Sequence, residues 1–211
     1  MVREFLLNQL WSALLVVSVL YLIDYRLSII GRRLFRQGAD RHYDLGGSYE
    51  LNTPFIADIE AGRLISHRHL VALLRIWATL AVAWWFTVHA GRLIPLYTGV
   101  VGFFLLTQMP VFMRHTQNIV LFSFVARRGG IEGRARAARW LDLKLSGVLF
   151  WYFTAVFLLL WGLLGDALFA GGALGTLLAG ARFWIFGGEA EEGEAGSAMD
   201  ASASGSEPLV P

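Results

Sequence analysis

Apolar runs long enough to cross a bilayer alternate in this chain with short segments rich in arginine. Fourteen of the 18 basic residues fall in two of these segments, 24–69 and 114–144. A spanning helix needs about 20 mostly apolar residues, and polytopic membrane proteins collect Lys and Arg in cytoplasmic loops. The pattern predicts an all-α integral membrane protein built as a bundle of four transmembrane helices. The four runs are 5–23, 70–88, 94–113 and 145–164.

The same charge bias predicts the orientation. Arginines follow the first run instead of preceding it, so we expect the N-terminus outside and segments 24–69 and 114–144 in the cytoplasm. The expected location is the cell (inner, cytoplasmic) membrane. Residues 1–186 hold 18 basic and 10 acidic residues, a balance that suits a lipid bilayer with anionic headgroups. Nucleic acid is not an expected partner, because the arginines adjoin span ends instead of forming a separate basic domain.

A fifth apolar segment, 167–186, is rich in glycine and contains Arg182. Its length suits either a fifth span or a membrane-surface hairpin. Small residues recur at every fourth position, which lets helix backbones approach closely, so we expect a helix-packing seam. The seam comprises Ala167, Gly171, Gly175 and Ala179.

Residues 1–186 form one membrane helical domain on this interpretation, and residues 187–211 form its tail. The tail is rich in Gly, Ala, Ser and Glu, contains no basic residue and lacks aromatic side chains. Such a composition has little apolar surface to bury. It predicts a disordered acidic tail.

The cytoplasmic segments contain their own local patterns. Residues 41–52 alternate apolar and polar side chains around a glycine pair, which predicts a small hairpin. Thr53-Pro54 resembles a helix start, and this helix should run to about Arg63. Residues 131–144 predict a basic amphipathic helix at the membrane surface.

Polar residues gather near the cytoplasmic end of the third run. Gln108, Arg114, His115 and Asn118 fall with Thr107 on one arc of a continuous helix, although Pro110 could kink it. Asp24 and Arg75 should lie at similar depth, and we expect Asp24 to pair with Arg75 or Arg114. The cluster either handles a proton, an anion or a headgroup, or fixes helix packing by polar contacts. Its members are Asp24, Arg75, Gln108, Arg114, His115 and Asn118.

Catalytic and metal-binding patterns find little support in the chain. Cysteine is absent, and no GxSxG, HExxH or P-loop spacing occurs. His67 and His69 are two positions apart, so on a helix they point in different directions. We therefore expect no metal site and no cofactor.

These patterns favour a non-catalytic role. We expect an accessory, scaffold or assembly subunit that associates with other membrane protein subunits or with itself, since the cytoplasmic segments could form a docking face. One alternative is a small oligomeric transporter or channel that uses the polar stripe. A further alternative is a membrane enzyme that handles a lipid or quinone at the inner leaflet.

Overall fold

The computed structural model describes residues 9–44, 53–90, 94–128, 135–136 and 138–204, with side chains as far as Glu191. The chain in this part is nearly all helical. Its long helices are α2 (Leu10–Arg36), α4 (His67–Ala90), α5 (Ile94–Leu106), α6 (Gln108–Arg128), α7 (Arg139–Leu164) and α8 (Ala167–Ser204). The short elements are η1 (Ala39–Arg41), β1 (Tyr43–Asp44), η2 (Thr53–Phe55), α3 (Ile56–Glu60) and β2 (Ala135–Arg136).

Within the described ranges, five segments are long and apolar enough to cross a membrane. They are α2, α4, α5 together with α6, α7, and α8 as far as Glu191. Each carries large apolar side chains on its outer surface, where contact with lipid suits them better than contact with water. The apolar segment 167–186 is thus part of a long helix and not a hairpin.

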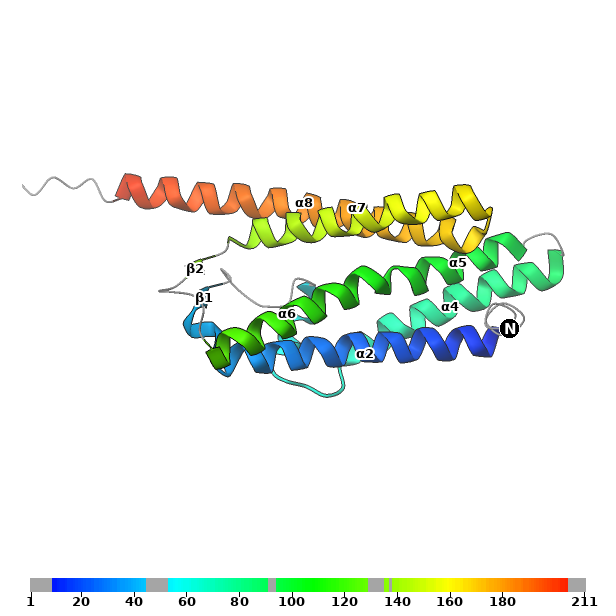
Figure 1. Ribbon diagram of the computed structural model, residues 1–211, viewed down its shortest axis with the longest axis horizontal. Helices are drawn as coiled ribbons and strands as arrows, with labels where there is room; N and C mark the ends of the chain where they lie inside the picture. Colours follow the sequence, from blue (N-terminus) through cyan, green and yellow to red (C-terminus); the bar gives the residue numbers. More distant parts are fainter. Residues whose placement is uncertain (1–8, 45–52, 91–93, 129–134, 137, 205–211) are drawn as a thin grey trace, which may run out of the picture.

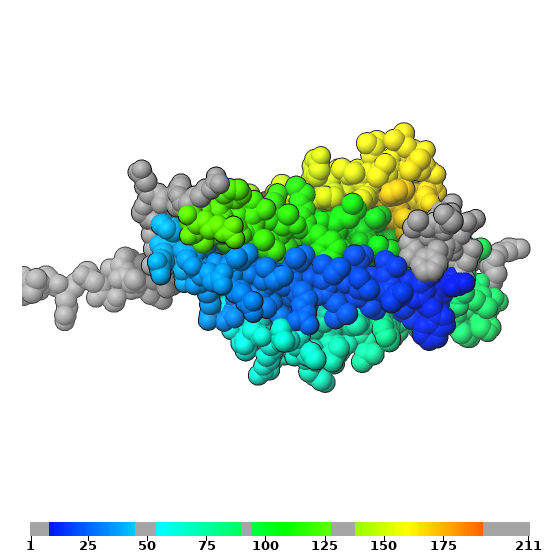
Figure 2. All heavy atoms as spheres, turned by 60° about the horizontal axis from the view of Figure 1, so that its bottom comes forward, coloured from blue at the N-terminus to red at the C-terminus, as the bar shows by residue number. Residues whose placement is uncertain are grey.

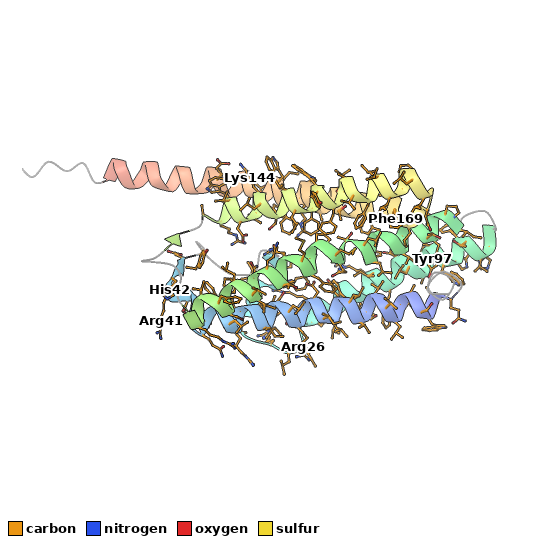
Figure 3. All side chains as sticks on the ribbon, in the orientation of Figure 1. Arg26, Arg41, His42, Tyr97, Lys144 and Phe169 are labelled. Atoms are coloured by element: carbon orange, nitrogen blue, oxygen red, sulfur yellow. The ribbon has the colours of Figure 1, made fainter. Side chains whose placement is uncertain are left out.

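The long helices lie side by side along one axis (Figure 1). α2 and α6 end beside β1 and β2 at one end of the bundle, whereas the α4–α5 and α7–α8 connections lie at the other (Figure 1). Arg26, Arg41 and Lys144 lie toward the first end, and Tyr97 and Phe169 toward the second (Figure 3). The last turns of α8 extend past the first end of the bundle (Figure 1).

One apolar core joins α2, α4 and α5. α2 runs along one face of the molecule between α6 and α4 (Figure 2). The indole N–H of Trp77 on α4 donates to the Ser18 hydroxyl on α2 at 2.8 Å. The buried side chains of this core are Ala13, Leu14, Val17, Leu80, Ala83, Tyr97 and Val101.

The predicted small-residue seam lies against α5. A Cβ added to Gly171 would collide with the backbone of Gly99, and one added to Gly175 would collide with the Thr107 hydroxyl. Ala167 contributes its carbonyl, which would lie 3.5 Å from a Cβ on Gly99. Close approach of two helix backbones is the geometry that small residues permit. Ala179, the last seam residue, is half-buried.

α8 also packs along α7. Gly180 faces Gly147, where an added Cβ would lie 3.1 Å from the opposite carbonyl oxygen. In the middle of this contact the hydroxyls of Thr154 and Thr176 lie 2.9 Å apart, and both side chains are buried. The two helices are therefore matched by small residues and by one polar pair.

The helix of the third run is interrupted at Thr107, between α5 and α6. Pro110 explains the position, because its ring crowds the carbonyl four residues earlier and it has no N–H to donate there. That carbonyl belongs to Leu106, the last residue of α5. The polar stripe was expected on one continuous helix. The break instead falls at Thr107, the first residue of the stripe.

Segments 24–69 and 114–144 differ from the expected hairpin and surface helix. β1 pairs in parallel with β2, so Tyr43 lies opposite Ala135 in the other segment. The rest of the expected hairpin, 45–52, lies outside the described residues. Residues 135–136 are strand and helix α7 begins only at Arg139, so the expected helix over 131–144 is wrong at these positions, and 131–134 lie outside the described part.

The tail is helical as far as Ser204, which does not confirm disorder beginning at Gly187. Ala and Glu are strong helix formers, and they continue a helix that is already packed. Lys144 of α7 forms an ion pair with Glu191, and a Cβ on Gly187 would lie 3.2 Å from the Trp140 carbonyl oxygen. Residues 205–211 of the predicted tail lie outside the described residues.

Candidate functional site

A small polar cavity lies where α2, α4, α6, α7 and α8 converge beside α3. Its volume is about 110 Å³, room for several water molecules, since one needs roughly 10–15 Å³. Its floor and far wall are apolar, formed by Phe55, Ile59, Phe150 and Phe183 among others. The polar side chains that line it are Tyr21, Asp24, Tyr25, Ser28, His69, Arg114 and His115.

The Asp24 carboxylate and the His115 imidazole contact each other inside this cavity. Nε2 of His115 lies 2.8 Å from Oδ1 of Asp24 and 3.4 Å from the Ser28 hydroxyl. His115 is only 6 % exposed. A catalytic triad uses one ring nitrogen for the nucleophile and the other for the carboxylate. Here the contacts with Asp24 and with Ser28 involve the same nitrogen, Nε2. This is not the geometry of a catalytic triad.

His69 is held between aromatic rings at the start of α4. Its ring stacks on Tyr21 at 4.3 Å between centroids, lies 4.5 Å from Tyr25, and meets the edge of Phe55 at 5.9 Å. The residue is 4 % exposed, yet Nε2 has no hydrogen-bond partner among the described residues. Buried polar atoms are nearly always paired. The ring is thus fixed in place with one nitrogen left for a further partner.

Arg114 supplies the positive charge of the cavity. It is half-buried on α6, and its guanidinium carbon lies 6.0 Å from the ring centroid of Phe183. Its Nε is buried without a hydrogen-bond partner, and no carboxylate of the described chain lies within ion-pair distance. Arg114 thus has no direct ion-pair partner among the described residues.

The segment before α4 positions His69 through a chain of polar contacts. Asp58 of α3, which is buried, accepts hydrogen bonds from the Ser66 hydroxyl at 2.5 Å and from Nη1 of Arg63 at 2.9 Å. The Ser66 bond and the Arg63 charge lower the pKa of the Asp58 carboxyl, although its burial opposes them. The Ser66 oxygen in turn accepts the backbone N–H of His69 at 3.2 Å. Ser66 is therefore the N-terminal cap of α4.

Ion pairs fasten the same segment to α2. Glu60 contacts Nε of Arg32 at 3.1 Å and Nη2 of Arg36 at 2.6 Å. The Tyr25 hydroxyl donates to the carbonyl of Arg63 at 2.8 Å. These contacts hold Phe55 and Ile59 as the floor of the cavity. The segment before α4 thus forms one wall of the cavity.

The structure brings together three of the six residues expected in the polar cluster. Asp24, Arg114 and His115 line the cavity, whereas Arg75 is exposed on α4. Gln108 and Asn118 are half-buried and do not line it. Asp24 pairs with His115, and within the described residues neither Arg75 nor Arg114 lies at ion-pair distance from it.

Sequence reasoning missed His69 and its aromatic neighbours. A signal was present in α2, where Tyr21, Asp24, Tyr25 and Ser28 have the i, i+3, i+4, i+7 spacing of one helix face. The described residues contain no group of three or more His, Cys, Asp or Glu side chains arranged to hold a metal ion. Comparison with protein families, with curated proteins and with solved structures finds no match to this chain.

Proposed function

We propose that the protein is a multi-pass protein of the cell membrane that binds an oxyanion in this cavity. The observation that carries the proposal is the pair of unsatisfied groups there. The Arg114 guanidinium has no carboxylate partner among the described residues, and the buried Nε2 of His69 has no hydrogen-bond partner. A carboxylate or phosphate group would meet both requirements, since guanidinium groups bind such anions through charge-assisted hydrogen bonds.

The energetics favour an anion over a neutral ligand. A charged side chain within a spanning helix costs roughly 2.5–3.5 kcal/mol on insertion scales, and a bound anion would offset part of that cost for Arg114. Asp24 is the carboxylate that lines the cavity, and Nε2 of His115 lies 2.8 Å from its Oδ1. A neutral ligand would leave the Arg114 guanidinium without a charged partner among the described residues.

The proposed orientation puts the cavity near the cytoplasmic leaflet. With five spans and the N-terminus outside, the arginine-rich end of the bundle and the end of α8 face the cytoplasm. This agrees with the rule that positive residues stay inside. On this orientation α4, whose first turn supplies His69 to the cavity, begins on the cytoplasmic side.

Thermal unfolding of the full chain in detergent tests the proposal. Phosphate or acetate should raise the midpoint relative to chloride at equal ionic strength, because a ligand that binds only the folded state stabilises it. The shift should persist in Arg75→Gln, whose arginine is exposed on α4, and should vanish in Arg114→Gln. Equal shifts in both variants would overturn the proposal.

A second candidate role is the accessory or scaffold subunit expected from the sequence. It is favoured by the projection of α8 past the end of the bundle (Figure 1). The projecting part carries acidic residues, including Glu192, Glu194 and Asp200, which suit a basic partner surface. Pull-down with the full chain and with a chain truncated after Glu191 tests this role. Capture of one defined partner by the full chain alone would support it, and identical captures would contradict it.

A further inference from the structure

An apolar groove of about 340 Å³ lies next to the polar cavity, between α5–α6 and α7–α8. The two spaces share three wall residues, Val111, Phe150 and Phe183. The Phe183 ring lies 5.4 Å from that of Phe150, and it also faces the Arg114 guanidinium. Phe183 is half-buried. Its side chain therefore separates a polar space from an apolar one.

The groove extends from the cavity along α5–α6, away from the arginine-rich end of α6. Phe103 and Thr107 line it, and Phe103 lies 11 positions before Arg114 along α5–α6. That separation corresponds to roughly 16 Å at the helical rise. A ligand with its head beside Arg114 would thus direct a chain along the groove into the depth that hydrocarbon occupies.

We propose that the ligand of the cavity is an amphiphile with an oxyanionic head and an apolar chain. The head binds beside Arg114 and His69, and the chain lies in the groove against Leu178. This inference rests on the proposed oxyanion site and adds the chemical class of its ligand. Fatty acids and phospholipids share this chemistry, with a carboxylate or a phosphodiester as the head.

Arg182 is the cation that lines the groove itself, whereas Arg114 lines the neighbouring cavity. It is exposed, and its guanidinium carbon lies 5.2 Å from the ring centroid of Phe186. An exposed guanidinium on a spanning helix can snorkel toward headgroups or water, so it gains less from a ligand anion than a half-buried one. The head is therefore assigned to Arg114, and Arg182 serves as a comparison.

Binding of tritiated palmitate to the purified full chain in detergent, measured by scintillation proximity, tests the inference. Unlabelled palmitate should compete better than octanoate, and octanoate better than acetate. Palmitate methyl ester, which has no charge, should compete at least tenfold more weakly, since charge-assisted hydrogen bonds are the strong ones. Phosphatidylglycerol as a competitor distinguishes a phosphodiester source from a carboxylate source.

Two adjacent leucines on α8 provide a matched pair of variants. Leu178 lines the groove and Leu177 does not, while both are about half exposed, at 53 % and 46 %. Leu178→Trp should fill the groove and weaken palmitate binding by roughly tenfold, with little effect on the stabilisation by acetate. Leu177→Trp should leave both unchanged. Equal effects of the two tryptophans would overturn the groove assignment.

The charge variants separate failure of this inference from failure of the oxyanion site. Arg114→Gln should weaken palmitate binding by roughly tenfold or more, and Arg182→Gln should have a much smaller effect. Anion stabilisation without any dependence on chain length would overturn the amphiphile inference alone. Palmitate binding that depends on Arg182 and not on Arg114 would overturn both.

Discussion

Asp24 on α2 and His115 on α6 are 91 positions apart in the chain and are joined by a 2.8 Å contact between carboxylate and imidazole. The side chains are 23 % and 8 % exposed, so water screens the contact only in part. The pair links two helices that pack along each other. Both side chains line the cavity that Arg114 also lines.

Loss of this pair should destabilise the fold. Removal of one partner of a buried ion pair costs about 3–5 kcal/mol, and we expect Asp24→Ala to fall toward the lower end because Asp24 is partly exposed. Asp24→Asn should cost less, since its amide oxygen can still accept the Nε2–H bond. Chemical unfolding in mixed micelles measures both variants. Equal costs for the two would argue against the hydrogen bond.

Removal of the unpaired Nε2 of His69 should affect stability differently from loss of the Asp24–His115 pair. His69→Phe keeps the ring between Tyr21 and Tyr25 and removes Nε2, a buried atom without a partner. The free energy of unfolding should stay the same or rise, because an unsatisfied buried polar group costs about 1–3 kcal/mol. Stabilisation by phosphate should fall in the same variant. Unchanged phosphate stabilisation would remove His69 from the site.

Asp58 makes the fold depend on pH. Its pKa is lowered in the folded chain by the Ser66 hydroxyl and by Arg63, against the effect of burial. A carboxyl whose folded pKa lies below its unfolded value contributes stability above the unfolded value and loses it as the pH falls. Stability should therefore decline below about pH 4, and Asp58→Asn should reduce that dependence.

The matching measurement is the unfolding midpoint of the wild-type chain and Asp58→Asn between pH 7 and pH 3. At pH 7 the variant should be less stable by about 1–3 kcal/mol, since Ser66 and Arg63 lose a charged acceptor. The two curves should converge at low pH. Parallel curves would show that Asp58 is not the group responsible.

The contact between α5 and α8 predicts a contrast between two glycines. Gly171→Ala places a methyl group against the backbone of Gly99, so overpacking should cost about 1–3 kcal/mol. Gly162→Ala on α7 has open space around it and should stabilise the helix by roughly 0.5–1 kcal/mol. Unfolding in mixed micelles measures both. Equal responses would contradict the close approach of α5 and α8.

The sequence alone located the long helices well, because a helix is the simplest way to satisfy backbone polar groups in lipid. The run 145–164 lies within α7, and 70–88 lies within α4. The disorder expected from the tail's low apolar content is not confirmed as far as Ser204, because its Ala and Glu residues favour helix. The contacts of α8 with Trp140 and Lys144 could not be predicted from local composition.

The candidate site was foreseen only in part. Depth in the membrane follows from position along a span, so Asp24, Arg114 and His115 could be grouped from the sequence. Which of them pair depends on how α2 and α6 are rotated, and hydropathy does not fix that rotation. His69 was not grouped with them, because its burial depends on the cap at Ser66 and the rings of α2.

The claim that the cavity holds an oxyanion is tested most directly by a crystal structure of the full chain grown with selenate, whose selenium scatters anomalously. The account predicts a selenium peak in the cavity, with selenate oxygens within hydrogen-bond distance of Nε of Arg114 and Nε2 of His69. The same peak should be absent from crystals of Arg114→Gln. Peaks confined to exposed arginines such as Arg75 and Arg182, with an empty cavity, would contradict the account.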